Sequence, residues 1–470
     1  MPYQQEFANK SAHFDIVKNP EVAKFLDGCS YLQPPSDEES QKLAAKFVVP
    51  PNFDAKLLPE RVIAVDGSLH ESSINDKLPS TKIGYVKIGS VLIDLAQYGA
   101  LRVDGGRYVD PFRVAEMENS NSPLTFSLPS ANIRTHGKKS VRESFRAIVD
   151  EHLYSGRTRF VESDPKTSLR STLFHLAAER PGPLGTGDPG KLRLHKCPEC
   201  EKGPIEVLDV PDQQKCPHCS SEVYPSDCLR VWEEVSDFQS NYQAISRFML
   251  QVEHMLPMHY ARFLIAQSPA SLSSSVFFLD GPLAVFGNGA WLHAAILRYL
   301  DRLKIELAKG NYSPVLIIGL QKTGQVADHV AFIDRFLPSN RIYAIEDEYR
   351  YKYILAGRDP SSNGFGSETY YGQDFIYKTL SGRVFVLAIP YPFPNKQISG
   401  INFADAKAEI DRYSDLPKAL SLINHFETDL YENAVVPIAL AHRYTAISLS
   451  PGGRVLDLLT RKAMEQKGLD

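Results

Sequence analysis

Short apolar runs alternate with amphipathic stretches along the second half of the sequence. The runs 274–283 (SSVFFLDGPL), 313–321 (SPVLIIGLQ) and 383–392 (RVFVLAIPYP) each have the length of one strand, whereas 291–307 and 325–337 carry apolar residues at helical spacing. Strands that alternate with helices are typical of an α/β fold. We therefore predict an α/β architecture for this half.

The first half begins with a cluster of strands and continues with a more polar segment. RVIAVDGS at 61–68 predicts a buried strand that runs into an Asp-Gly turn, and 83–97 alternates as one or two further strands. Residues 117–137 are rich in Asn, Ser and Pro and predict a surface loop. Helical patterns follow at 141–153 and 168–180.

These patterns divide the chain into four parts. Residues 1–60 contain several prolines and predict an N-terminal arm with short helices. We interpret residues 61–110 and 228–470 as two parts of one core, and 111–227 as an insertion between them. We expect the second core part to begin with a long helix that runs from about residue 228 into the 260s.

Four of the six cysteines form two pairs inside the insertion. Their spacing is C-x2-C-x15-C-x2-C, which favours metal binding over disulfides in a chain without a visible secretory signal. Four thiolates complete a closed tetrahedral shell and leave no position for water, so we predict a structural zinc ribbon at about 195–224. The predicted zinc ligands are Cys197, Cys200, Cys216 and Cys219.

Composition and charge exclude several classes of protein. Of 470 residues, 52 are Lys or Arg and 56 are Asp or Glu; the net charge of −4 argues against a polybasic nucleic-acid binder but permits a local basic groove. No apolar run approaches the roughly 18–20 residues of a membrane span. The first residues lack the basic and apolar regions of a secretory signal, so we expect a cytoplasmic protein without a membrane partner.

Two patterns resemble nucleotide-binding motifs but lack the required context. Residues 185–190 match G-x-G-x-x-G, yet they lie in a Pro/Gly-rich linker at 180–191 and not between a strand and a helix. The stretch from Gly137 to Ser140 resembles the end of a P-loop but lacks the first glycine of that motif. We therefore predict no nucleotide site in this chain.

Asp66 and Asp280 each end an apolar run and precede a glycine. Aspartate is disfavoured in strands, and a carboxylate at the end of a buried strand needs a partner or a metal. If the two strands are neighbours, both carboxylates converge at one edge of the sheet, as in two-metal phosphodiesterase sites that hold magnesium or manganese. The alternative is that both residues belong to ordinary Asp-Gly turns.

Five motifs together resemble those of the NurA nuclease family. They are VIAVDGS, IGYVKIGSVLIDL, VFFLDGPL, IIGLQKTGQVAD and PIALAHRYTAIS, in the order that the family has them, over roughly residues 60–110 and 228–460. The resemblance implies an RNase H-like mixed sheet flanked by helices, with an inserted helical and zinc-ribbon segment. It also implies a nuclease that cuts DNA with a divalent metal ion, Mn²⁺ or Mg²⁺.

The resemblance also implies three ligands for this metal. Asp66 matches the family's first-strand metal aspartate, and Asp280 matches the aspartate of its LDG motif. Glu253 resembles the family's helical metal glutamate. Because the interval from Glu253 to Asp280 is stretched, Glu233 and Glu234 stay open as alternatives, and Glu253 is otherwise a solvated helix residue.

Two further side chains are implied to assist the reaction. Lys322 resembles a lysine that can stabilise phosphate charge, and is otherwise a surface lysine. His442 matches a late histidine that can orient or protonate at the scissile phosphate, and is otherwise structural. Where the family usually has a tyrosine, eight residues earlier, this chain has Ala434; Tyr431 lies nearby, and the role of the tyrosine stays unassigned.

Two hypotheses of different classes follow. The first is a metal-dependent DNA nuclease for DNA end processing or phage defence, which the resemblance implies to be a homodimer acting beside a HerA-like hexameric ATPase. The absence of a P-loop in the sequence fits a motor supplied by another chain. The second is a non-catalytic adaptor that binds DNA or the ATPase and carries a structural zinc ribbon.

Overall fold

A computed structural model describes most of the chain. The described residues are 13–29, 34–52, 58–75, 77–99, 123–355, 358, 360, 363–397, 400–428, 434–448 and 451–467. Among them, no helix combines the length and the hydrophobicity that a membrane crossing requires.

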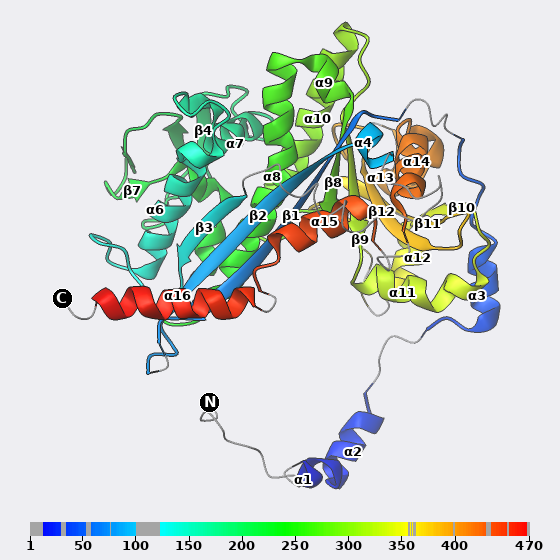
Figure 1. Cartoon of the computed structure of the whole chain (residues 1–470), viewed down its shortest axis with the longest axis horizontal. Helices are drawn as coiled ribbons and strands as arrows, with labels where there is room; N and C mark the ends of the chain where they lie inside the picture. The colour runs from blue at the N-terminus through cyan, green and yellow to red at the C-terminus, as the bar shows by residue number, and fades with distance from the viewer. Residues whose placement is uncertain are drawn as a thin grey trace.

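One mixed sheet forms the centre of the described structure (Figure 1). Its eight strands lie in the order β10-β11-β12-β9-β8-β1-β2-β3. Antiparallel pairing joins β1, β2 and β3, whereas β8 and β9 run parallel to β1, which is the RNase H-like arrangement. The strands are β1 (Arg61–Ser73), β2 (Lys82–Asp94), β3 (Leu124–Pro129), β8 (Ser275–Asp280), β9 (Leu316–Gln321), β10 (Arg341–Ala344), β11 (Gly372–Lys378) and β12 (Val384–Pro390).

Helices cover both faces of this sheet, which confirms the predicted fold class. On one face, α8 (Tyr242–Gln267) and α10 (Trp291–Lys309) share a hydrophobic core with inward residues of β1 such as Val65. On the other, α14 (Leu416–Phe426) and α15 (Val436–Thr445) pack on the alternate residues, such as Ala64. Alternation along β1 therefore decides which face each side chain serves.

The remaining helices are peripheral or short. α3 packs through Leu43 against α11 and β10, and α16 lies along the exposed end of β1 and β2 (Figure 1). The short helices α1 and α2 bury no residue. These elements are α1 (Phe14–Val17), α2 (Pro20–Asp27), α3 (Asp37–Ala44), α4 (Leu95–Gly99), α9 (Pro269–Ser273), α11 (Gln325–Ile333), α12 (Asp347–Tyr349), α13 (Phe403–Ala406) and α16 (Gly452–Lys467).

The strand β1 does not end where the sequence pattern suggests. The predicted Asp-Gly turn after residue 65 is wrong, because β1 continues through Asp66 and Gly67 to Ser73 and stays paired with β2 along its whole length. The second Asp-Gly pair behaves as predicted: β8 ends at Asp280, and Gly281 has a φ of 115°. Asp66 is thus held inside a paired strand, and not in a loop.

The segment at 111–227 contributes to the sheet as well as to the insertion. The predicted surface loop is wrong at 124–129, because β3 pairs there with β2 and directs Phe126 and Leu128 into the core. We therefore propose that the insertion itself begins after β3. It comprises α6 (Val141–Tyr154), α7 (Leu169–Ala178) and the short strands β4 (Lys191–Leu194), β5 (Ile205–Leu208), β6 (Gln214–Lys215) and β7 (Glu222–Val223).

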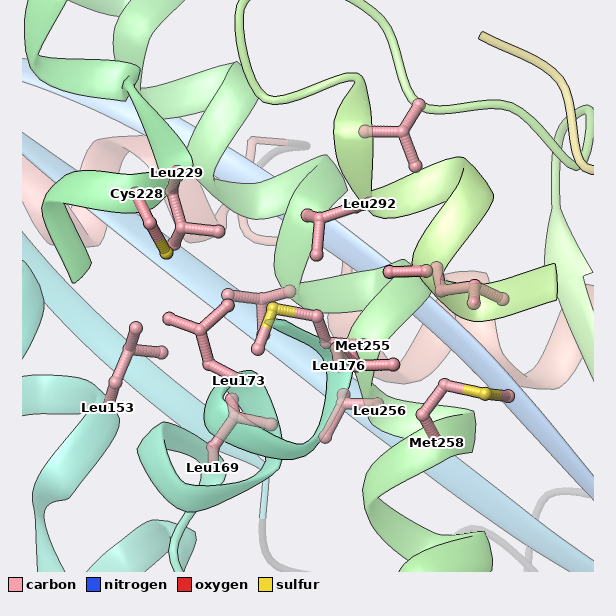
Figure 2. Packing of buried hydrophobic residues seen from close by; sticks show 14 of the residues in the cluster. Leu153, Leu169, Leu173, Leu176, Cys228, Leu229, Met255, Leu256, Met258 and Leu292 are labelled. Atoms are coloured by element: carbon pink, nitrogen blue, oxygen red, sulfur yellow. The ribbon is translucent and has the colours of Figure 1, made fainter. Parts of the chain in front are cut away.

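The insertion is packed firmly onto the core. Figure 2 shows Leu173 of α7 between Leu153 of α6 and the α8 residues Met255 and Leu256, and Leu229, which follows the ribbon, belongs to the same cluster. The predicted helix start near residue 228 is wrong: two 3-10 helices, Pro225–Leu229 and Val231–Glu234, precede α8. The ribbon and α8 therefore belong to one continuous hydrophobic core.

Candidate metal centres

Asp66, Asp280 and His442 meet at one end of the sheet. β1 and β8 are parallel neighbours with Val65 opposite Leu279. Asp66 and Asp280 are the next residue on each strand, so they lie side by side at the same level of the sheet. His442 comes from α15, 376 positions after Asp66. One potential ligand atom from each of the three residues lies within 4.8 Å of the other two.

Every oxygen of the Asp66 carboxylate has a hydrogen-bond partner. Its Oδ1 accepts from the backbone N–H of Gly67 at 2.9 Å, and its Oδ2 is 2.9 Å from His442 Nδ1. The hydroxyl of Thr445 also donates to Oδ2, at 3.2 Å. These contacts orient a carboxylate that is only 6% exposed, and explain how an aspartate is tolerated within a strand.

Glu253 approaches the same end of the sheet from the opposite face. Asp66 points toward α15, whereas Gly67 faces α8, where a Cβ on the glycine would lie 2.3 Å from Glu253 Oε1. Glu253 is 7% exposed, so it is not a solvated helix residue. Its carboxylate lies outside the group of atoms that Asp66, Asp280 and His442 form.

The Glu253 carboxylate is an electrostatically unfavourable group in this place. Burial, Asp66 and Asp280, in that order, raise the pKa of Glu253 well above its usual range. None of the ion pairs between described residues involves Glu253. A buried carboxylate without a cationic partner is costly, and a bound cation removes that cost.

Lys322 pairs with Asp280 and is not an isolated surface lysine. It follows β9, and its Nζ lies 2.5 Å from Asp280 Oδ2. Burial raises the pKa of Asp280, and Lys322 opposes that effect while Asp66 adds to it. The lysine therefore compensates part of the negative charge that the carboxylates concentrate here.

His442 is the most accessible member of the group. Its side chain is 51% exposed, and the hydrogen bond to Asp66 raises the pKa of its ring. The ring thus connects a buried carboxylate to the solvent-facing side of the site. A histidine in such a position can bind a metal ion when neutral or donate a proton when charged.

The other candidates from the sequence are placed elsewhere or are not described. Glu233 is paired with Arg230, and Glu234 with Arg247, so both alternatives to Glu253 already have cationic partners. Ala434 is buried at 5% exposure, and Tyr431 lies outside the described residues.

Two residues of the carboxylate site were not predicted from the sequence. Gly67 leaves the space that Glu253 occupies, and Thr445 supports Asp66. Gly67 directly follows the aspartate, and Thr445 lies three positions after His442 on the same helix, a spacing that places two side chains on one face. That spacing was the available signal for Thr445.

The four cysteines of the insertion form a second cluster. Cys197 Sγ lies 3.7 Å from Cys219 Sγ, and Cys200 Sγ lies 3.8 Å from Cys216 Sγ. Four thiolates around a tetrahedral zinc ion, with Zn–S bonds of about 2.3 Å, have their sulfurs about 3.8 Å apart. These distances fit zinc and are far longer than the roughly 2.05 Å of a disulfide bond.

The two halves of the cysteine cluster have the same backbone design. The backbone N–H of the second residue after Cys197 donates to its Sγ at 3.4 Å, and the same contact occurs after Cys216. Each loop then turns through one residue in the left-handed region, Glu201 at φ 59° and Ser220 at φ 61°. Such loops hold two thiolates toward one point, as a structural zinc site requires.

The ribbon is fixed to the helices around it by buried ion pairs. Arg146 of α6 is bonded to Asp227 through two nitrogens, each at 2.8 Å, and donates to the backbone carbonyl of Glu222. Arg170 of α7 pairs with Asp150 and Asp209. The ribbon is therefore part of a rigid unit with α6 and α7.

The donor atoms of the two clusters suit different metals. Thiolates select zinc, whereas carboxylate oxygens suit Mg²⁺ or Mn²⁺. The cysteine cluster thus fits a structural zinc ion, and the Asp66–Asp280–His442 group fits a divalent ion.

Comparisons with known proteins add little to this geometry. No family model and no curated protein matches the sequence. The NurA nuclease from Sulfolobus solfataricus matches 97% of this chain and 96% of its own with 9% identity and a TM-score of 0.35. A second NurA crystal structure matches 96% of each chain with 11% identity and a TM-score of 0.27.

Proposed function

We propose that this chain is a divalent-metal-dependent DNA nuclease. The observation that carries the proposal is the convergence of Asp66, Asp280 and His442 from three separate elements within 4.8 Å. The buried Glu253 beside them supports it, because that carboxylate has no ion-pair partner among the described residues and a cation would offset its charge. The motifs that resemble the NurA family provide the choice of DNA as substrate.

Each residue has a distinct role in this proposal. Asp66 and Asp280 hold the metal, and Glu253 completes the negative charge from the α8 face. A bound Mn²⁺ or Mg²⁺ lowers the pKa of a water molecule and neutralises charge on the phosphate. Lys322, which compensates Asp280, lies where it can also contact a phosphate oxygen of the substrate.

His442 can act in proton transfer at the exposed side of the site. The Asp66 carboxylate raises the pKa of the ring, so His442 keeps its proton to a higher pH than a free histidine. A protonated imidazole can donate to the leaving oxygen as the phosphodiester bond breaks. If its ring instead coordinates the metal, that proton must be lost first.

The ribbon and the partners complete the proposal. We assign zinc to Cys197, Cys200, Cys216 and Cys219 in a structural role. The resemblance supports a homodimer that acts with a HerA-like hexameric ATPase in DNA end processing or phage defence. Light scattering on the purified chain and copurification with an ATPase encoded beside it test these two partners separately.

The direct test combines Mn²⁺ with linear DNA. We expect cleavage by the wild-type chain and a loss on the order of 10²–10³-fold or more in Asp66→Asn and in Asp280→Asn. Asp328→Asn is the matched control, because Asp328 is an exposed aspartate on α11. It removes one negative charge without touching the site.

Two outcomes would contradict the proposal. Cleavage at wild-type levels in both site variants would sink the assigned site. Cleavage by none of the chains, with or without an ATPase and with any divalent metal, together with retained DNA binding, favours the adaptor. Such a result would be explained by one feature of this chain, the replacement of the family tyrosine by Ala434.

A further inference from the structure

The last turn of α15 is held against the sheet at three points. α15 runs from Val436 to Thr445 and carries His442 in this turn. One contact reaches Asp66 on β1, and the other two involve β2, the strand on the far side of β1 from Asp280. The contacts decide where the His442 ring lies relative to the carboxylates.

Thr445 makes the first contact. It is fully buried, and its hydroxyl lies 3.2 Å from Asp66 Oδ2 and 3.0 Å from the carbonyl oxygen of Ala441. His442 and Thr445 are three positions apart on the helix, so both side chains reach the same carboxylate oxygen from one face. The hydroxyl thus ties the helix to the carboxylate that His442 also contacts.

The second contact is the close approach of α15 to Gly89, which is possible because glycine has no side chain. Gly89 lies directly opposite Asp66 in the β1–β2 pairing. A Cβ at this position would be 2.7 Å from Tyr444 Cδ1 and 2.9 Å from Thr445 Cγ2. Any larger residue would therefore push the end of α15 away from Asp66.

Lys87 makes the third contact, at the C-terminus of the helix. Its Nζ donates to the backbone carbonyl of Tyr444 at 2.5 Å and lies 4.7 Å from the centre of the Tyr444 ring. Backbone carbonyls in the last turn of a helix lack partners within the helix, and a positive charge there is favourable. Lys87 thus caps the helix that carries His442.

We propose that Thr445, Gly89 and Lys87 form a latch that positions His442 and Asp66 at the metal site, with Thr445 and Lys87 as positioning residues. The proposal rests on the proposed function of this site, because it takes the Asp66–Asp280–His442 group to be the metal site. Without the latch, α15 is free to tilt, and the imidazole loses its fixed place beside the carboxylate.

The test uses the zinc-loaded full chain and compares Thr445→Val with Thr445→Ser. Valine keeps the shape of the side chain without the hydroxyl, and serine keeps the hydroxyl. We expect calorimetry to show Mn²⁺ binding about tenfold weaker in Thr445→Val, and within about threefold of wild type in Thr445→Ser. DNA cleavage at limiting Mn²⁺ should follow the same order, and saturating Mn²⁺ should restore part of the loss.

A second pair addresses the cap. Lys87→Met is expected to weaken Mn²⁺ binding about threefold, and Lys87→Arg to retain most of it. Tyr85→Phe is the matched control, because Tyr85 lies on the same strand but bonds Thr460 of α16. It should leave Mn²⁺ binding unchanged, since α16 carries none of the proposed ligands.

The outcomes distinguish the latch from the site itself. If the wild-type chain binds no Mn²⁺, the proposed function fails. If the wild-type chain binds Mn²⁺, and Thr445→Val and Lys87→Met both bind it as tightly as the wild type, the latch is overturned. Should Thr445→Val fail to fold, the Lys87 pair decides, and equal loss in Lys87→Met and Tyr85→Phe would count against the latch.

Discussion

The two candidate metal centres of this chain are built in opposite ways. The cysteine cluster takes its ligands from residues at most 22 positions apart, and its own loops direct backbone N–H groups at the sulfurs. The carboxylate group joins residues 376 positions apart and concentrates negative charge that only partly finds a cation. With zinc bound, the first would be closed and would stabilise the fold, whereas the second is open on the His442 side and gathers carboxylates that need a cation.

This difference suits the task of each cluster. A structural zinc site contributes folding energy and keeps no open position. A catalytic site commonly carries unfavourable groups that the rest of the fold supports. The two regions should therefore respond in opposite directions when one ligand is replaced.

The largest expected effect is on the cysteine cluster. Cys216→Ser removes a buried ligand, and we expect loss of the one zinc ion per chain that metal analysis should find in the wild type. Zinc binding at such sites is worth on the order of 10 kcal/mol, so thermal unfolding should occur at a much lower temperature. Cys29→Ser, at an exposed cysteine, is the control and should change neither quantity. Full zinc content in Cys216→Ser would contradict the assignment.

A pair of buried glutamates tests the opposite behaviour of the open site. Burial, Asp66 and Asp280 raise the pKa of Glu253, so this residue destabilises the metal-free fold at neutral pH, either as a buried charge or through the cost of holding a proton. This penalty declines as the pH falls from the raised pKa to the ordinary value of a glutamate. Glu253→Gln should therefore raise the free energy of unfolding without metal, on the order of 1 kcal/mol, while it abolishes cleavage.

Glu71 is the matched control for that change. It is buried too, but hydrogen bonds from Lys82, Ser130 and Ser240 outweigh the effect of burial and lower its pKa. Its oxygens also accept from the backbone N–H of Asn241, at the start of α8. Glu71→Gln should lower the free energy of unfolding by about 2 kcal/mol. If chemical denaturation shows that the free energy of unfolding changes in the same direction in both glutamine variants, the two glutamates do not differ in this way.

A smaller effect is expected from the glycine beside Asp66. Gly67→Ala places a methyl group 2.3 Å from Glu253 Oε1 and 3.0 Å from Met249 Cγ, so the Glu253 side chain must move. We expect Mn²⁺ affinity to fall about fivefold to tenfold, with the zinc content unchanged. Gly99→Ala is the control, because a Cβ there contacts nothing within 4 Å. Unchanged Mn²⁺ affinity in Gly67→Ala would remove Glu253 from the site.

The smallest effect concerns protons. Binding of a cation favours the ionised form of Glu253, whose pKa is raised, so Mn²⁺ binding at neutral pH should release protons and weaken as the pH falls. Calorimetry in two buffers of different ionisation enthalpy measures this release. Glu253→Gln should release fewer protons, and identical values for both chains would argue against Glu253 as a ligand.

The sequence predicts both clusters through different signals. The cysteine spacing is a local pattern, and the loops that carry it need no information from the rest of the chain. The pair Asp66 and Asp280 is predicted because each follows an apolar run, and the structure places their strands side by side. Glu253, Lys322 and His442 depend on the resemblance, since no local pattern distinguishes them from ordinary helix and loop residues.

What the sequence does not predict depends on how the strands pair. β1 passes through Asp66 and Gly67 because β2 pairs with it along all 13 residues, and this partner overrides the local turn preference of Asp-Gly. β3 alternates over only six residues within a polar stretch, so its pattern is hidden by its neighbours. β10, which the sequence analysis did not predict, is likewise a short strand, and its partner β11 follows only after a long interval. β11 was not predicted either, although it pairs with the next strand, β12.

The residues of the carboxylate group lie far apart in the sequence, and this has a consequence for biosynthesis. Asp66 leaves the ribosome long before His442 and Thr445, and domains generally fold in the order of synthesis. The zinc ribbon can be complete long before α15 exists. A nascent or C-terminally truncated chain should therefore load zinc normally and yet be harmless to DNA.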